Sequence, residues 1–209
     1  MIKIQFGVVM SMFSAETRIL NAARDLFFEH GFSGVSTDML AREAAVSKAT
    51  IYRHFTNMTD ILRRLTELET AKISGSDQPK IETRDDLQNA LTQFGMRLLT
   101  FLNSSDTIEF SRVIHEEARK NPDMGQAFFL AAYGKTNNAL ARIIQEAADN
   151  GLLLLTETPQ DIAEDLMALF TGSGMKRAML GVCDIPYDRM DRNVDRAVHT
   201  IMTVYGAQG

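Results

Sequence analysis

The chain has 209 residues, of which 45% are hydrophobic and 23% are charged, a composition that is typical of a folded, soluble protein. Its one cysteine, Cys183, excludes an intramolecular disulfide framework and a cysteine-rich metal site. The formal net charge of −5 disfavours contact with nucleic acid, unless the basic side chains are gathered in one region.

The charge is unevenly distributed along the chain. Residues 1–70 contain eight Lys/Arg and eight Asp/Glu, whereas the remainder contains 14 and 19. The stretch from 42 to 64 has only two acidic side chains against five basic ones, which are Arg42, Lys48, Arg53, Arg63 and Arg64. The local field is therefore positive there, and contact with phosphate is permitted.

Residues 1–13 form an apolar run with one lysine. We expect an N-terminal arm, or a start codon assigned too early with Met10 or Met12 as the true start. No later segment reaches the roughly 18 uninterrupted apolar residues of a membrane span, so we expect no membrane contact. The single cysteine fits a reducing compartment, and the predicted location is cytoplasmic.

Four helices are predicted within residues 14–74. Apolar residues at helical spacing indicate the first, over 15–30, and Gly31 ends it. Ser36 or Thr37 caps the second, Ser47 caps the third, and Asn57 opens the fourth. Leu40 and Ala44 of the second helix and Ile51 and Phe55 of the third have the spacing of buried residues.

A turn-rich stretch, "SGSDQPK" at 74–80, predicts a linker over 75–82 and a second domain over 83–209. Cap and stop signals there indicate five helices, near 83–103, 106–120, 122–149, 159–181 and 187–206. The only strand-like run is "LLLL" at 152–155. The predicted fold class is all-α, with about nine helices.

Two short helices around a tight turn, at about 37–56, predict a helix-turn-helix, whose second helix enters the major groove of DNA. If Ile51 and Phe55 face inward, Lys48 faces outward and its ammonium group can donate to guanine O6 and N7. The candidate DNA-binding residues are Ser36, Thr37, Lys48, Ala49, Thr50, Tyr52, Arg53 and His54. The alternative is that Ser36 is only a cap and that Tyr52 lies at the edge of the core.

The order of residues 19–62 resembles the DNA-binding domain of the tetracycline-repressor (TetR) family, through the pattern "AA..LF...GF...ST...LA..A.VS..T.Y.HF". Residues 110–125, "FSRVIHEEARKNPDMG", resemble the AefR-like subgroup of regulatory domains. The resemblance implies base contacts at Lys48, Ala49 and Tyr52. It implies contacts with the phosphate backbone at Thr37, Thr50 and His54.

Two positions depart from the family pattern. Ala45 stands in the turn where the family usually has glycine, and it is strained if the backbone φ there is positive. Met58 stands where the family favours lysine just after the cap of the fourth helix, so one phosphate contact is expected to be lost.

The resemblance also implies an inducer pocket and a homodimer interface in the second domain. Met and Phe side chains adapt to varied ligands, and the candidate pocket residues are Phe94, Met96, Phe101, His115, Phe128, Phe129, Tyr133, Met167 and Phe170. The resemblance places the interface on the last two helices, where the candidates are Ile162, Leu166, Leu169, Val194, Val198 and Ile201. The alternative for both sets is ordinary packing within one chain.

Enzyme motifs are not found. "IHEEAR" lacks the second histidine of a zinc-protease helix, and "TGSGMK" is not a phosphate-binding loop. We predict no catalysis, no cofactor and no metal. The predicted function is a ligand-responsive, DNA-binding transcription regulator, most simply a repressor that leaves a palindromic operator when a small hydrophobic ligand binds. The alternative is a ligand-binding helical protein with weakened or lost DNA binding.

Overall fold

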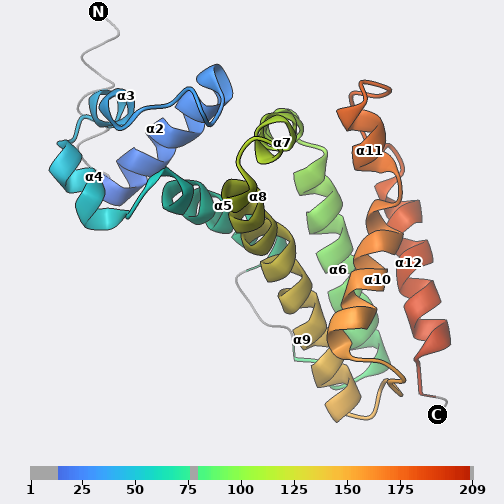
Figure 1. Cartoon of the computed structure of the whole chain (residues 1–209). Coiled ribbons are helices and arrows are strands. Elements are labelled where there is room, and N and C mark those ends of the chain that lie inside the picture. Colours follow the sequence, from blue (N-terminus) through green and yellow to red (C-terminus); the bar gives the residue numbers. More distant parts are fainter. Residues whose placement is uncertain (1–13, 76–79, 208–209) are drawn as a thin grey trace, which may run out of the picture. The chain divides into compact units, whose positions relative to one another are not determined.

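The computed structural model of the chain describes residues 14–75 and 80–207, which form helices joined by turns (Figure 1). This confirms the predicted all-α class, and the predicted arm at 1–13 lies outside the described residues. The elements are α2 (Ala15–His30), α3 (Thr37–Glu43), α4 (Lys48–His54), α5 (Met58–Ser74), α6 (Arg84–Leu102), α7 (Ser105–Ala118), α8 (Pro122–Phe129), the π-helix η1 (Leu130–Gly134), α9 (Lys135–Asp149), α10 (Pro159–Thr171), α11 (Gly174–Met179) and α12 (Met190–Val204).

Most of the predicted caps are present. Ser36 Oγ accepts from the Met39 amide at 3.3 Å, and Asn57 Oδ1 accepts from the Asp60 amide at 2.8 Å. The helix expected at 106–120 begins slightly earlier, at Ser105, because Ser104 Oγ accepts from the Thr107 amide at 3.1 Å. Each accepted bond satisfies a backbone donor that has no partner within its helix.

Two of the nine expected helices are divided. The expected helix at 122–149 is interrupted by η1, which the cap and stop signals of the sequence do not indicate. The expected helix at 159–181 breaks at Gly172, whose φ of 46° lies in the left-handed region that glycine adopts readily. The "LLLL" run does not form a strand. It contributes one isolated antiparallel bridge, between Leu153 and Gly206.

The described residues form two compact units, and their boundary is not the predicted linker. Residues 14–67 and 109–131 make up the first, which we call the N-terminal unit. Residues 68–75, 80–108 and 132–207 make up the second, the bundle unit. The N-terminal unit therefore includes a segment from the middle of the chain that the sequence assigned to the second domain.

The N-terminal unit is built around α2 to α5, with α7 and α8 packed against them. Ile114 of α7 and Met124 of α8 are buried in the same core as Ile51 and Phe55. The Phe110 ring lies between those of Phe28 and Phe128. Its centroid is 5.6 Å from that of Phe28 and 6.1 Å from that of Phe128. These contacts attach the middle segment to the helices that follow the N-terminus.

A polar contact strengthens this attachment. The Ser33 hydroxyl donates to the carboxylate of Glu117, which is 8% exposed and also pairs with Lys120 at 3.2 Å. The hydrogen bond from Ser33, followed by that from Lys120, lowers the pKa of Glu117 below its usual range. Glu117 is therefore a structural anion of the N-terminal unit.

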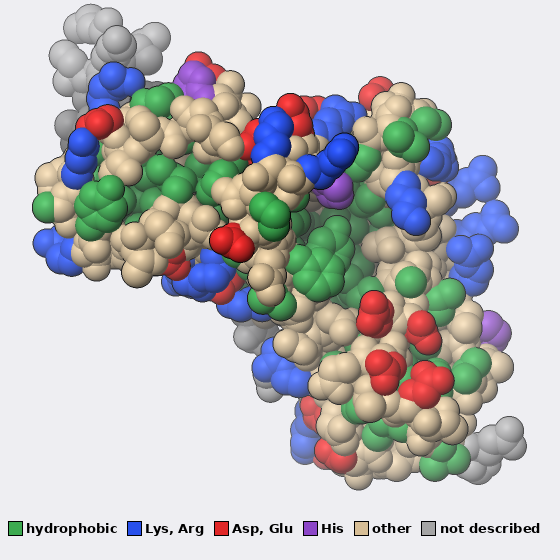
Figure 2. All heavy atoms as spheres, in the orientation of Figure 1, with side chains coloured by type: hydrophobic (Ala, Val, Ile, Leu, Met, Phe, Trp, Pro, Cys, Tyr) green, Lys and Arg blue, Asp and Glu red, His purple; other side chains and the backbone are tan. Residues whose placement is uncertain are grey.

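The core of the bundle unit is supplied mainly by α6, α9, α10 and α12. Its outer surface carries much of the negative charge. Asp161, Glu164 and Asp165 are exposed along α10, where Figure 2 shows acidic side chains gathered. None of the helices in the described ranges is long and apolar enough to cross a membrane.

Candidate nucleic-acid interface

The turn between α3 and α4 is short and tightly held. Residues 44–47 form it, and the Val46 amide donates to the Ala41 carbonyl at 3.0 Å. Arg18 of α2 donates to the Ala45 carbonyl at 3.2 Å. The side chains of Leu40, Ala44 and Ile51 are at most 2% exposed, and they fix α3 and α4 against the rest of the unit.

Ala45 has a φ of 50°, and it is the only residue other than glycine with a positive φ among those described. The backbone φ at Ala45 is therefore positive, which is the condition under which the sequence predicts strain at this residue. An L side chain is strained in this region, whereas glycine adopts it readily.

We expect Ala45→Gly to raise the free energy of unfolding by about 1 kcal/mol, because it relieves this strain. In a chain of this size the thermal midpoint should rise by about 2–4 °C. The matched control is Ala71→Gly, at an exposed helical position of α5, which should cost about 1 kcal/mol. A midpoint for Ala45→Gly at or below that of the unchanged protein contradicts this prediction.

The eight candidate DNA-binding residues lie on α3 and α4 or at their starts, and all are exposed or half-buried. Tyr52 is 58% exposed, which excludes the alternative that it is a core residue. Its hydroxyl lies 3.4 Å from that of Thr37, so the two helices meet at this point. The Thr50 hydroxyl lies 2.9 Å from that of Ser47, the cap of α4.

Lys48 is not free. Its Nζ lies 2.7 Å from Oδ1 of Asp38, and both side chains are largely exposed. The hydrogen bond to Asp38, together with the attraction between the two charges, raises the pKa of Lys48 above its usual range. Asp38 was not among the predicted site residues, because it lies ten positions away across the turn and no helical spacing relates the two.

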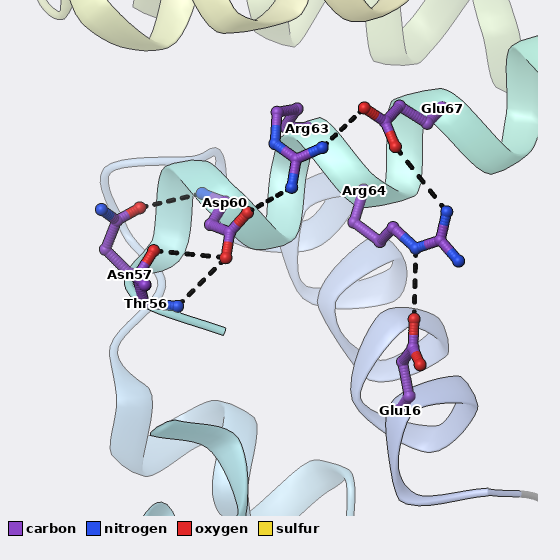
Figure 3. A network of polar contacts seen from close by, with 7 residues as sticks. All are labelled: Glu16, Thr56, Asn57, Asp60, Arg63, Arg64 and Glu67. Carbon is purple, nitrogen blue, oxygen red and sulfur yellow. Dashed lines mark hydrogen bonds and ion pairs between the residues drawn. The ribbon is translucent and has the colours of Figure 1, made fainter. Parts of the chain in front are cut away.

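The two arginines of α5 are also paired, as Figure 3 shows. Arg63 contacts Asp60 and Glu67, each at 2.6 Å, and Arg64 contacts Glu16 at 3.1 Å. These carboxylates neutralise two of the five basic side chains counted between residues 42 and 64. Lys48 is likewise paired with Asp38. Arg42 and Arg53 form no ion pair with the residues described, so the positive field depends mainly on these two arginines.

Asp60 connects this network to the start of α5 (Figure 3). Its Oδ2 accepts from the Thr56 amide at 3.1 Å while Oδ1 contacts Arg63. Burial alone raises the pKa of Asp60, but the hydrogen bonds from Thr56 and Arg63 outweigh it and the net shift is downward. Asp60 therefore stays ionised and keeps Arg63 turned toward its own chain.

Two family models match the sequence that carries this helix-turn-helix and the bundle. The model for the C-terminal domain of AefR-like transcriptional repressors matches residues 89–207, which is more than half of the chain. The model for bacterial regulatory proteins of the tetR family matches residues 19–65. The chain belongs to the TetR family. Its members are transcriptional regulators and not enzymes.

Curated relatives match parts of the chain. UidR of Escherichia coli strain K12 is 39% identical over 49 residues, which cover 23% of this chain and 25% of UidR. YdeS of Bacillus subtilis is 34% identical over 89 residues, 42% of each protein. The TetC protein of transposon Tn10 is 27% identical over 133 residues, 61% of this chain and 64% of TetC. The chain thus matches a quarter of the length of UidR.

Solved structures show the same TetR-family fold over nearly the whole chain. A TetR regulator from Agrobacterium tumefaciens has a TM-score of 0.76 and 21% identity, and covers 94% of this chain and 97% of its own. The flavonoid-responsive regulator FrrA has a TM-score of 0.75 and 24% identity, and the match covers 93% of this chain and 98% of FrrA.

The Met58 departure from the TetR-family pattern has a structural counterpart. Met58 is the first residue of α5, and its half-buried side chain packs against the core of the N-terminal unit. A thioether in this position stabilises the domain by burial. Since Arg63 and Arg64 are neutralised nearby, they do not replace the cation that the family favours here.

The structure does not bring the nine predicted pocket residues together in one unit. His115, Phe128 and Phe129 belong to the N-terminal unit, and the other six belong to the bundle unit. Phe94 and Phe170 are at most 1% exposed and fill the bundle core, as the alternative of ordinary packing expects. Met96, Phe101 and Met167 are partly buried against that core, whereas Tyr133 is 51% exposed.

The predicted interface residues also lie in the bundle core. Five of them are at most 3% exposed within a single chain. These five are Ile162, Leu166, Val194, Val198 and Ile201. The sixth, Leu169, is half-buried against the same core. Side chains buried in their own chain offer no surface to a second chain, so the prediction for these five residues is corrected to packing within the bundle.

Proposed function

We propose that this TetR-family regulator is a cytoplasmic, ligand-responsive repressor, which binds a palindromic operator and leaves it when a small hydrophobic ligand binds the C-terminal domain. The observation that carries the proposal is the exposed surface of α3 and α4, where Lys48 at the start of α4 and Tyr52 and Arg53 in its later part are all exposed. A helix presented in this way fits the major groove, with its first residues at the base edges.

Repression is supported by the match of residues 89–207 to the C-terminal domain of AefR-like transcriptional repressors. A ligand response is supported by an unusual polar group in the bundle unit. The hydroxyl of Tyr187 is buried and forms no hydrogen bond of normal geometry with the residues described, although the Met175 backbone lies near it. Buried polar groups are rarely left without a partner, and a bound molecule is one way to supply it.

Homodimerisation is proposed because a palindromic operator requires a two-fold symmetric protein. The outward faces of α10 and α12 are open to a second chain. Asp161, Glu164 and Asp165 are exposed on α10, and Arg192 and Arg196 are exposed on α12. The same helix also exposes Asp191 and Asp195, so the surface of α12 is close to neutral and does not repel the acidic face of α10 of a partner. In the dimer the two copies of α4 are expected about 34–36 Å apart.

The test is selection of bound sequences from a random pool of DNA duplexes by the full-length protein. We expect an inverted repeat to be enriched and its affinity to fall steeply with salt. The double variant Lys48→Ala/Tyr52→Ala, with an unchanged thermal midpoint, should lose the enrichment. Equal binding of all sequences, with no enrichment, favours the alternative of a ligand-binding protein with lost operator recognition.

A further inference from the structure

We propose that Asp38 and Lys48 act as one unit that recognises a guanine–cytosine base pair in each operator half-site. This rests on the proposed DNA-binding function and deepens it by naming the base pair and a recognition residue on α3, the helix that precedes the recognition helix.

The first support is the position of the pair. Lys48 is the first residue of α4, where side chains contact base edges in a helix-turn-helix, and Asp38 is the second residue of α3. The Asp38 side chain is 75% exposed and that of Lys48 is 52% exposed. Tyr52 and Thr37 meet beside them. Both charged groups are therefore accessible at the surface that faces DNA under the proposed function.

The second support is that the pair has little structural purpose. Ser36 already caps α3, and Ser47 caps α4. An ion pair between exposed side chains contributes little to stability, because water solvates both charges. A carboxylate on a surface that must approach phosphate also opposes binding. An acidic residue in the first turn of α3 gains about 0.3–1 kcal/mol from the helix dipole, but that gain does not require an ion pair with Lys48. A recognition role explains why the carboxylate is paired with Lys48.

The chemistry of the base pair matches the ion pair. In the major groove guanine presents the acceptors O6 and N7, and cytosine presents a donor at N4. O6 and N4 are joined by the base-pair hydrogen bond, at about 2.9 Å. Lys48 Nζ and Asp38 Oδ1 are 2.7 Å apart, which is close to the spacing of O6 and N4. The donor of the ion pair can therefore face the acceptor of the base pair while its acceptor faces the donor. The ammonium group can donate to O6 while the carboxylate accepts from N4, without breaking the ion pair.

Other base pairs fit less well. If the pair is reversed, the ammonium group meets the N4 donor and the carboxylate meets O6, and both contacts are repulsive. On an adenine–thymine pair the carboxylate can accept from N6, but the adjacent N7 acceptor repels it. The thymine methyl beside O4 also obstructs the ammonium group. On guanine, by contrast, N7 gives the ammonium group a second acceptor.

The experiment repeats the random-duplex selection with the full-length protein and three variants, which are Asp38→Ala, Lys48→Met and the control Glu82→Gln. Alanine and methionine have no group that can replace the carboxylate acceptor or the ammonium donor. Glu82 forms an exposed pair with Lys80 at 2.6 Å, so its replacement removes the same charge away from α3 and α4. We expect the unchanged protein and Glu82→Gln to enrich the same half-site, with one fixed guanine–cytosine pair. Asp38→Ala and Lys48→Met should lose that preference while keeping the other positions.

A second measurement isolates the carboxylate. N4-methylcytosine at the selected position replaces the hydrogen that faces the major groove and keeps the base pair. We expect it to weaken binding of the unchanged protein by at least about fivefold, the lower end for one base contact. Binding by Asp38→Ala, which has no acceptor for the N4 hydrogen, should change less than twofold. Thermal midpoints of all variants, measured in parallel, show whether each is folded.

The outcomes separate the two proposals. If the unchanged protein enriches no sequence, the proposed function fails and this inference fails with it. If it enriches a half-site that Asp38→Ala selects equally well, or if N4-methylcytosine weakens both proteins equally, the function stands and the role of Asp38 is overturned.

Discussion

Replacement of Gly174 by alanine is expected to lower the free energy of unfolding by about 2–3 kcal/mol, near the upper end of the cost of overpacking a core. A Cβ at this position would lie 2.7 Å from Tyr187 Cζ and 2.9 Å from the Pro186 carbonyl oxygen, with Tyr187 Cε1 closer still. Alanine normally favours a helix over glycine by about 1 kcal/mol, so the predicted sign depends on the clash outweighing that gain.

The Tyr187 ring has little freedom to move away from the added methyl group. Tyr187 is 2% exposed. Its backbone is held on both sides by Asn103, which accepts from the Tyr187 amide at 3.0 Å and donates to its carbonyl at 2.8 Å. The clash must therefore be relieved by shifting α11 or by breaking these two hydrogen bonds.

Urea unfolding of the full-length protein measures the effect. The matched comparison is a double-mutant cycle with Tyr187→Leu, in which the ring that causes the clash is absent. The cost of the alanine should fall below about 1 kcal/mol in that background, because contacting residues are not additive. A Gly174→Ala protein as stable as the unchanged one contradicts the close packing of Tyr187 on α11.

The local features of the recognition surface could be predicted from the sequence. A cap depends on residues three positions apart, and Ser36, Ser47 and Asn57 each accept the expected amide. Helical spacing also separates inward from outward residues, so Ile51 and Phe55 are buried while Lys48 is exposed. Such features need only the neighbouring residues.

Contacts between distant residues could not be predicted in this way. Glu117 lies 84 positions from Ser33, and no periodicity relates the two. Asp38 and Lys48 meet only because the turn at Ala45 brings α3 and α4 together. Periodicity likewise shows which face of a helix is apolar but not what covers it. The apolar residues of α10 and α12, which the resemblance places at a dimer interface, therefore could not be told from core residues of their own chain, whose core they fill.

The second large effect is expected at high pH. Burial raises the pKa of Tyr187 from 10.0 to about 12. Below pH 10 the phenol is protonated in both the folded and the unfolded chain, and its ionisation has no effect on stability. Between pH 10 and 12 the unfolded chain releases the proton while the folded chain retains it, so stability falls as pH rises. A shift of about two units corresponds to about 2–3 kcal/mol.

The Tyr187→Phe variant provides the control for this loss. Other groups titrate in the same range, so the quantity to compare is the difference in unfolding free energy between the unchanged protein and the variant. We expect that difference to move by about 2 kcal/mol in favour of the variant between pH 9 and pH 12. A constant difference across this range contradicts the shifted pKa of Tyr187.

The same variant at neutral pH tests whether the Tyr187 hydroxyl lacks a partner. Removing a buried hydroxyl that forms no hydrogen bond eliminates a desolvation cost of about 1–3 kcal/mol, so Tyr187→Phe should be at least as stable as the unchanged protein. A partner that is bound in solution reverses this sign, because the variant then loses a hydrogen bond. A purely structural tyrosine changes stability without changing the release of operator DNA by a hydrophobic ligand. If Tyr187→Phe is stabilised and also releases operator DNA less readily when ligand is added, Tyr187 contacts the ligand.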